Sequence, residues 1–173
     1  MPDLIIFAGP NGAGKTTFAR EYLSGGEARF AFVNADEIAR RLALEAEGKS
    51  RSDLRAGKMM LDSINKFVDA GADLAIETTL ATLTYATKIP TWRERGYTVS
   101  LFYLRLNSVA ESLERVRKRV AAGGHNIAPE VIERRFPKSA DYFEIIYKPI
   151  VNNWRVWESR EGEFIPVASS DWS

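Results

Sequence analysis

Residues 9–16 read Gly9-Pro10-Asn11-Gly12-Ala13-Gly14-Lys15-Thr16, a stretch that fits the pattern G-x-x-x-x-G-K-[ST]. Glycines in this pattern let the backbone curl so that successive N–H groups point at phosphate oxygens. The pattern predicts that Lys15 reaches the β- and γ-phosphates of ATP and that the Thr16 hydroxyl binds Mg²⁺. The residues expected to bind the nucleotide are Gly9, Asn11, Gly12, Ala13, Gly14, Lys15, Thr16 and Thr17.

The sequence on either side of this loop decides between a phosphate site and a glycine-rich turn that binds nothing. The apolar run at residues 4–8 is typical of a buried strand, and a helix-like stretch begins near Lys15. A helix that starts there directs its positive end at the same phosphates. This strand–loop–helix order favours the phosphate site.

The rest of the chain alternates in the same way. Short runs rich in β-branched and aromatic residues are separated by stretches with apolar residues at helical spacing. This alternation predicts an α/β fold with a mostly parallel sheet of five to six strands flanked by helices. The expected strands are residues 4–8, 30–33, 74–76, 99–104, 154–157 and 164–168, and the expected helices include 53–70, 108–122 and 129–147.

The composition of the chain excludes several classes of catalytic and metal site. The chain of 173 residues is expected to form one domain, and its formal net charge of +1 argues against nucleic acid as a partner. With no cysteine, thiolate nucleophiles and cysteine-ligated zinc are excluded, and the single histidine, His125, excludes a three-histidine metal site. The apolar run at residues 4–8 is too short for a signal peptide or a membrane span, so we expect a cytoplasmic protein.

Polar groups follow two of the expected strands, where ligands bind in folds of this class. Asp36 comes after the second strand, at a position suited to a base for a substrate hydroxyl or to a helix N-cap. Glu77-Thr78-Thr79 closes the third strand. Glu77 is a candidate to hold a water on Mg²⁺ or to bind a substrate hydroxyl, and the threonines are candidate donors to phosphate or sugar, although Thr is also common in turns.

The most basic part of the chain lies between residues 115 and 135, where two helix-like segments flank Gly123-Gly124. Such a charge run is often only a solvated helix face. In a nucleotide-binding domain, however, a mobile lid brings arginine to the charge that develops during phosphoryl transfer. The candidates on the two segments are Arg115, Arg119 and the helix face near Arg135. His125 between them either contacts phosphate or substrate or caps the turn.

Residues 23–27, Leu-Ser-Gly-Gly-Glu, resemble the signature of ABC-type ATPases. In ABC domains that signature lies far downstream on a separate helical subdomain, whereas here it directly follows the first helix. Gly25-Gly26 is better interpreted as a helix C-terminus. The sequence therefore disfavours an ABC-type ATPase.

Four segments together resemble the zeta-toxin family of P-loop kinases, and within it a short branch often labelled predicted ABC-type ATPase. They are AGPNGAGKTT (8–17), VNADEIA (33–39), IETTL (76–80) and RVAAGGHNI (119–127) with IERRF (132–136). The resemblance implies an adenylate-kinase-like P-loop domain with a short helical lid at about residues 115–135. It implies phosphorylation of a sugar hydroxyl, as better-known members phosphorylate UDP-N-acetylglucosamine, and a possible protein antitoxin.

The resemblance also assigns roles to residues. Lys15 and Thr16 match the phosphate-loop lysine and the magnesium-binding hydroxyl, and Asp36 matches the base for the substrate hydroxyl. Glu77 with Thr78 matches the motif that contacts substrate. The pair of charge-stabilising arginines is implied to be Arg119 and one of Arg134 or Arg135.

We therefore expect residues 1–173 to form one kinase domain that uses ATP and Mg²⁺ to phosphorylate a small-molecule hydroxyl, with a nucleotide sugar as the leading acceptor. Two alternatives remain open at this point. One is a kinase for another hydroxyl compound, such as an antibiotic, a free sugar or an RNA end. The other is a nucleotide-gated switch or ABC-like ATPase that acts through a partner.

Overall fold

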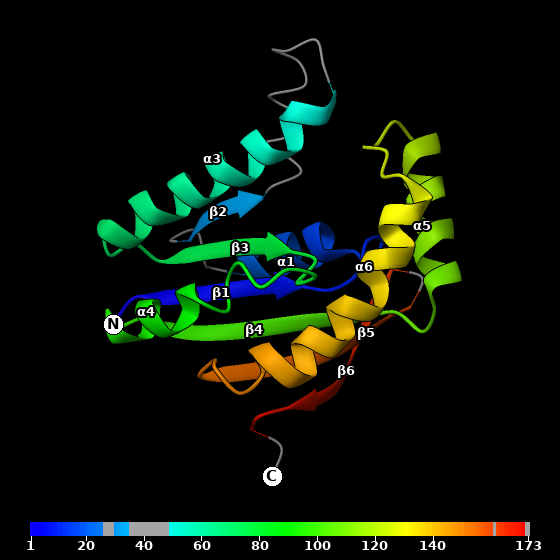
Figure 1. Cartoon of the computed structure of the whole chain (residues 1–173). Coiled ribbons are helices and arrows are strands. Elements are labelled where there is room, and N and C mark those ends of the chain that lie inside the picture. Colours follow the sequence, from blue (N-terminus) through cyan, green and yellow to red (C-terminus); the bar gives the residue numbers. More distant parts are fainter. Residues whose placement is uncertain (26–29, 35–48, 161, 172–173) are drawn as a thin grey trace.

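A six-stranded sheet forms the centre of the protein, with strand order β2-β3-β1-β4-β5-β6 (Figure 1). The computed structural model describes residues 1–25, 30–34, 49–160 and 162–171, and residues 49–56 in their backbone only. The first five strands run parallel and β6 pairs antiparallel with β5. The strands are β1 (Asp3–Ala8), β2 (Ala31–Asn34), β3 (Leu74–Thr78), β4 (Thr98–Arg105), β5 (Asn153–Arg160) and β6 (Glu163–Ser169). The predicted α/β class and mostly parallel sheet are confirmed.

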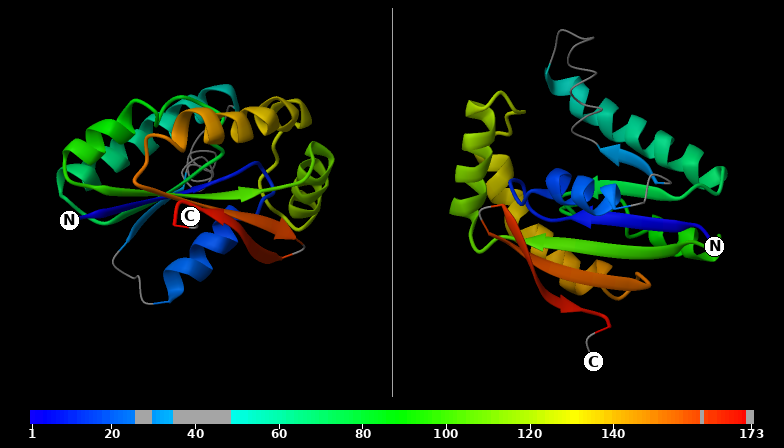
Figure 2. Two further views of the ribbon diagram at one scale, coloured as in Figure 1. Left: turned by 90° about the horizontal axis from the view of Figure 1, so that it is seen from below. Right: turned by 180° about the vertical axis from the view of Figure 1, so that it is seen from behind.

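The helices cover both faces of the sheet. Figure 2 shows α1 on one face and α3, α4 and α6 on the other. Their bounds are α1 (Lys15–Ser24), α3 (Lys49–Asp69), α4 (Lys88–Glu94), α5 (Val109–Ala121) and α6 (Pro129–Tyr142), which continues into the π-helix η1 (Phe143–Tyr147). Because both faces are covered, the central strands are buried on both sides, which explains why residues 4–8 form an unbroken apolar run.

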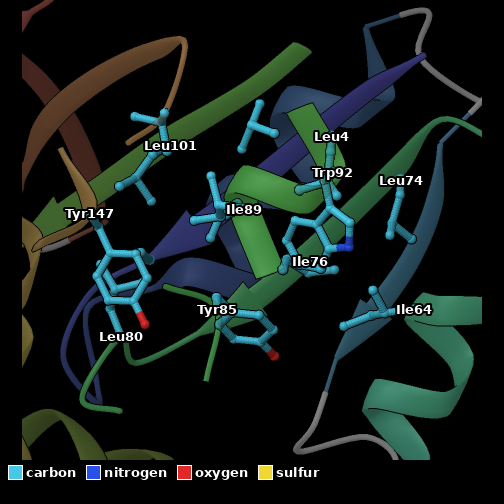
Figure 3. Close-up of a cluster of buried hydrophobic side chains, with 14 of the residues drawn as sticks. Leu4, Ile64, Leu74, Ile76, Leu80, Tyr85, Ile89, Trp92, Leu101 and Tyr147 are labelled. Atoms are coloured by element: carbon cyan, nitrogen blue, oxygen red, sulfur yellow. The ribbon is translucent and has the colours of Figure 1, made fainter. Parts of the chain in front are cut away.

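The larger apolar cluster lies on the face covered by α3, α4 and η1 (Figure 3). Ile64 of α3, Ile89 and Trp92 of α4, and Tyr147 of η1 all contribute to it. A second cluster on the α1 face contains Phe18 and neighbouring aromatic rings. Among the described helices, none combines the length and the apolar character needed to cross a membrane.

Local signals in the sequence explain several helix ends. The Ser108 side chain accepts a hydrogen bond from the Glu111 N–H at 3.1 Å and caps α5, as the spacing of Ser108 and Glu111 by three residues in the sequence favours. Helix α1 ends at Ser24 with Gly25 as its C-cap, again as expected. The segment predicted as one helix over 129–147 differs: it changes to π geometry after Tyr142, and the Lys148 N–H bonds to the Phe143 carbonyl.

Strand register brings the expected functional groups to one edge of the sheet. Glu77 of β3 lies opposite Phe7 of β1 and opposite Asn34 of β2. Both neighbouring strands run in the same direction as β3, so all three end at the same edge. The phosphate loop, Glu77 and Asn34 therefore meet at the carboxyl end of the sheet.

Candidate active site

The phosphate loop packs tightly against two other segments. Gly9 has φ 144°, and a side chain there would run into the carbonyl of Leu104 in β4. Gly12 has φ 80°, and its Cβ would lie 3.0 Å from both the Arg115 Cβ and the Ser112 carbonyl oxygen of α5. Both positions require glycine for backbone conformation and for space, so the pattern that predicts phosphate binding also permits this packing.

Helix α5 contacts the loop through polar groups. The Ser112 hydroxyl donates to the Asn11 carbonyl oxygen. The Arg115 guanidinium donates to the Ser159 hydroxyl of β5 at 2.7 Å and to Glu111 at 2.6 Å. Arg115, one of the candidate lid arginines, thus joins α5 to β5 beside the phosphate loop.

Glu77 receives hydrogen bonds from two other elements. Its Oε2 accepts from the Thr16 hydroxyl at 2.8 Å and from the Asn34 side-chain amide at 2.7 Å. Glu77 and Asn34 are both buried, at 7% and 8% exposed. The Thr16 hydroxyl and the carboxylate are hard oxygen donors, so together they fit the ligand preference of Mg²⁺.

Asn34 is a site residue that the sequence patterns above do not predict. A polar side chain at the last residue of β2, two positions before Asp36, is the feature that could have indicated it. Asp36 itself lies outside the described residues.

One cavity of about 510 Å³ opens beside these groups. Its polar lining comes from the phosphate loop, β2, β3 and α6, and its other wall comes from α3 and the segment after β3. The polar lining includes Asn11, Lys15, Asn34, Glu77, Thr78, Thr79 and Arg135. The cavity therefore brings together Lys15, Glu77, Thr78 and Thr79 with one of the two candidate arginines of α6.

Lys15 and Asn11 both line this cavity, and their side chains differ in hydrogen bonding. The Lys15 ammonium donates to the Pro10 carbonyl oxygen at 3.1 Å. The Asn11 side-chain oxygen is buried and has no hydrogen-bond partner in the described part of the chain. A buried polar atom without a partner is costly, so this oxygen adds a local cost to the packing of the loop.

Other predicted residues do not line the cavity. Arg134 and His125 are exposed, and Thr17 is exposed on α1. Arg119 of α5 donates to the carbonyl oxygen of His125 at 3.0 Å, while its Nε is buried without a hydrogen-bond partner in the described residues. Helices α5 and α6 contact each other, so Arg119 and Arg135 extend from two adjacent helices.

Hydroxyl groups of other elements anchor the segment after β3, residues 79–87. The Ser139 hydroxyl donates to the Thr79 carbonyl oxygen at 2.6 Å and lies 3.0 Å from the Tyr103 hydroxyl. Tyr147 donates to the Thr82 carbonyl oxygen. Within the same segment Leu80 has φ 61°, a strained conformation for a residue with a side chain. These contacts hold one wall of the cavity against α6 and η1.

We expect Ser139→Ala to lower the free energy of unfolding by about 1–3 kcal/mol, because Ser139 is fully buried and both of its partners lose a hydrogen bond. Urea unfolding followed by circular dichroism measures this. Lys138→Ala, at the exposed neighbouring position, is the control and should change stability by less than about 0.5 kcal/mol. Equal stability of the two variants would contradict the anchoring role.

Tyr85, in the same segment after β3, also lines the cavity. Burial raises the pKa of its hydroxyl well above the ordinary value, so the group stays protonated. This hydroxyl lies 3.6 Å from the Met60 sulfur and donates to it. The contact joins the segment after β3 to α3 at the edge of the cavity.

The sequence of the chain is similar to a family of known proteins. Residues 4–145 match a family model described as AAA domain. An uncharacterized protein of Haemophilus influenzae is 27% identical over 132 residues, which cover 76% of this chain and 91% of that protein.

Solved structures share the fold at low sequence identity. A chain of the PezAT chromosomal toxin–antitoxin system of Streptococcus pneumoniae superposes with a TM-score of 0.73 at 21% identity, covering 100% of this chain and 73% of that one. A chain of the Pnkp1/Rnl/Hen1 RNA repair complex gives 0.66 at 22% identity, covering 96% and 49%. Shikimate kinase from Acinetobacter baumannii, in complex with shikimate, gives 0.55 at 18% identity, covering 94% and 86%. At these identities the likeness shows a P-loop kinase-like fold.

Proposed function

The chain belongs to the AAA domain family, and from this membership and the cavity we propose that it is an ATP- and Mg²⁺-dependent kinase. It transfers the γ-phosphoryl group of ATP to a hydroxyl of a small molecule. The observation that carries the proposal is the cavity of about 510 Å³ at the carboxyl edge of the sheet, which Lys15, Glu77 and Arg135 line beside the phosphate loop.

The loop binds the phosphates through backbone N–H groups and Lys15. Thr16 would bind Mg²⁺ through its hydroxyl, and Glu77 would hold a water of the ion. The ion supplies positive charge that neutralises the phosphate oxygens during transfer. Asn34 holds the Glu77 carboxylate in place through the 2.7 Å hydrogen bond, so it positions the group that serves the metal.

Asp36 accepts the proton of the acceptor hydroxyl. The acceptor oxygen then forms a new bond to the γ-phosphorus, the bond from that phosphorus to the bridging oxygen breaks, and ADP leaves with the electron pair. Asp36 stands two positions after Asn34, whose side chain already reaches Glu77. This short distance along the chain supports a place for Asp36 beside the transferring group.

Arg119 and Arg135 stabilise the charge that develops on the transferred group. The helices that carry them, with the connection at Gly123-Gly124, form the lid at about residues 115–135. The Ser159 contact of Arg115 supports a fixed base for this lid, so closure involves the part beyond it.

A matched pair of variants separates the two adjacent arginines of α6. Arg135 lines the cavity and Arg134 is exposed, so Arg135→Gln is expected to lower kcat about 30-fold while Arg134→Gln stays close to the parent protein. Steady-state kinetics at saturating MgATP measures the difference. A larger loss in Arg134→Gln would assign the role to the other residue.

The leading acceptor is a nucleotide sugar such as UDP-N-acetylglucosamine. This assignment follows the resemblance to zeta toxins and the fold shared with the PezAT chain, and the hydroxyl groups of Thr78, Thr79, Thr82 and Thr84 support it because they suit a polyhydroxyl acceptor. The same resemblance makes a protein antitoxin the proposed partner and the cytoplasm the proposed location.

Transfer from [γ-³²P]ATP to a panel of acceptors tests the function. The panel contains UDP-N-acetylglucosamine, N-acetylglucosamine, shikimate, an aminoglycoside and a 5′-hydroxyl RNA. We expect labelled product from the nucleotide sugar and little ATP hydrolysis without acceptor. ATP hydrolysis that needs no acceptor, together with nucleotide-dependent dimerisation, would instead indicate a nucleotide-gated switch.

A further inference from the structure

Helix α3 presents one continuous face to the sheet and the cavity. Positions 57, 60, 61, 64 and 68 recur at helical spacing and therefore share that face. Met60, Ile64 and Val68 are buried, and Leu61 lies partly buried against the same core. In the part of α3 from residue 57 onward, Gly57 is the residue on this face that lacks a side chain.

In the described part of the chain, neither packing nor backbone conformation requires glycine at position 57. A Cβ built there meets no heavy atom of the described residues within 4 Å, and Gly57 is not among the glycines with positive φ. Glycine inside a helix costs about 1 kcal/mol relative to alanine. The fold would therefore accept a side chain at this position and even gain stability from one.

The missing side chain leaves space in the cavity. Gly57, Met60 and Leu61 all line it, so a side chain at position 57 would extend into the same space as its neighbours on this face. Thr79 and Thr82 also line the cavity, and their carbonyl oxygens accept hydrogen bonds from Ser139 and Tyr147. Because these two residues are anchored, this part of the lining cannot move away to make room for a larger group on α3.

We propose that Gly57 is a specificity-determining residue that sets the size of acceptor the cavity admits. The proposal rests on the proposed function, since it assigns this space to the acceptor rather than to ATP. The proposed function assigns the ATP phosphates to the loop at Asn11 and Lys15, so a group at position 57 is expected to shorten the acceptor space and to leave MgATP binding unchanged.

The absence of cysteine from the chain allows a direct test in folded protein. Gly57→Cys introduces a single thiol, and methyl or benzyl methanethiosulfonate then adds a small or a large group to it. Lys58→Cys is the matched control, because Lys58 is exposed on the same helix and does not line the cavity. Dithiothreitol removes either group and should restore the starting activity.

We expect the benzylthio group at position 57 to lower kcat/KM for the best acceptor of the panel about tenfold or more, and the methylthio group to lower it less. The calorimetric Kd for MgATP and the melting temperature should stay at the values before labelling. The labelled Lys58→Cys protein should keep its full kcat/KM.

Two results would overturn the proposal while leaving the kinase function intact. One is an unchanged kcat/KM after complete benzylthio labelling at position 57, and the other is a parallel loss of MgATP affinity. If the unlabelled parent protein phosphorylates no acceptor in the panel, the proposed function itself fails, and the role of Gly57 fails with it.

Discussion

The protein with Lys15 replaced by alanine is expected to bind MgATP about 100-fold or more weakly than the parent protein. Lys15 is buried, at 8% exposed, at the first turn of α1 and beside the cavity. Its ammonium group donates a hydrogen bond to the Pro10 carbonyl oxygen of the loop, and alanine removes this buried positive charge. Isothermal titration calorimetry with MgATP measures the change directly.

The control for this variant is Arg20→Ala, which removes an exposed positive charge from the same helix. It should leave MgATP affinity within about twofold, because exposed charges are screened by solvent and salt. Melting temperatures of both variants show whether the loss comes from unfolding. Unchanged affinity in folded Lys15→Ala would refute the assignment of the phosphate loop.

For Asp36→Asn we expect kcat to fall about 10²–10⁴-fold while MgATP affinity remains that of the parent protein. Asparagine keeps the size of the side chain and can still bind the acceptor hydroxyl, but it cannot accept the proton. Acceptor-dependent transfer at saturating MgATP and calorimetry on the same preparation provide the two measurements.

This substitution also separates the two interpretations of Asp36. Asparagine is as good an N-cap as aspartate, so a residue that only caps a helix would tolerate the change. Asp36→Ala removes both functions and should lower the melting temperature as well if the cap contributes. Equal turnover of Asp36→Asn and the parent protein would leave only the capping role. Glu37→Gln, the neighbouring carboxylate, serves as the control.

The fold could be predicted largely from local patterns. The loop pattern, the strand–helix alternation and the Ser108 cap each depend on neighbours in sequence, and the confirmed sheet and α5 N-terminus follow from them. The short helix α4 was not predicted, because its seven residues include a proline and offer too little periodicity. The π geometry at Phe143–Tyr147 also escapes periodicity, since that segment keeps the apolar spacing of a helix.

The sequence predicts several individual residues of the candidate site but not how they are arranged in space. Lys15, Glu77, Thr78 and Thr79 do line one cavity, as expected for groups at the ends of adjacent parallel strands. The distinction between Arg134 and Arg135 needed the rotation of α6, which the sequence leaves open. The contact of Arg115 with Ser159 joins positions 44 residues apart, and no local pattern encodes it.

The strand order has a consequence for the newly made chain. β1 lies between β3 and β4, both of which are synthesised after it, and the loop that follows β1 is supported by Ser112 and, through Arg115, by β5. As the ribosome delivers the chain, the apolar strand β1 must therefore stay without partners until β3 and β4 have emerged. Such a segment is a natural target for chaperones during translation.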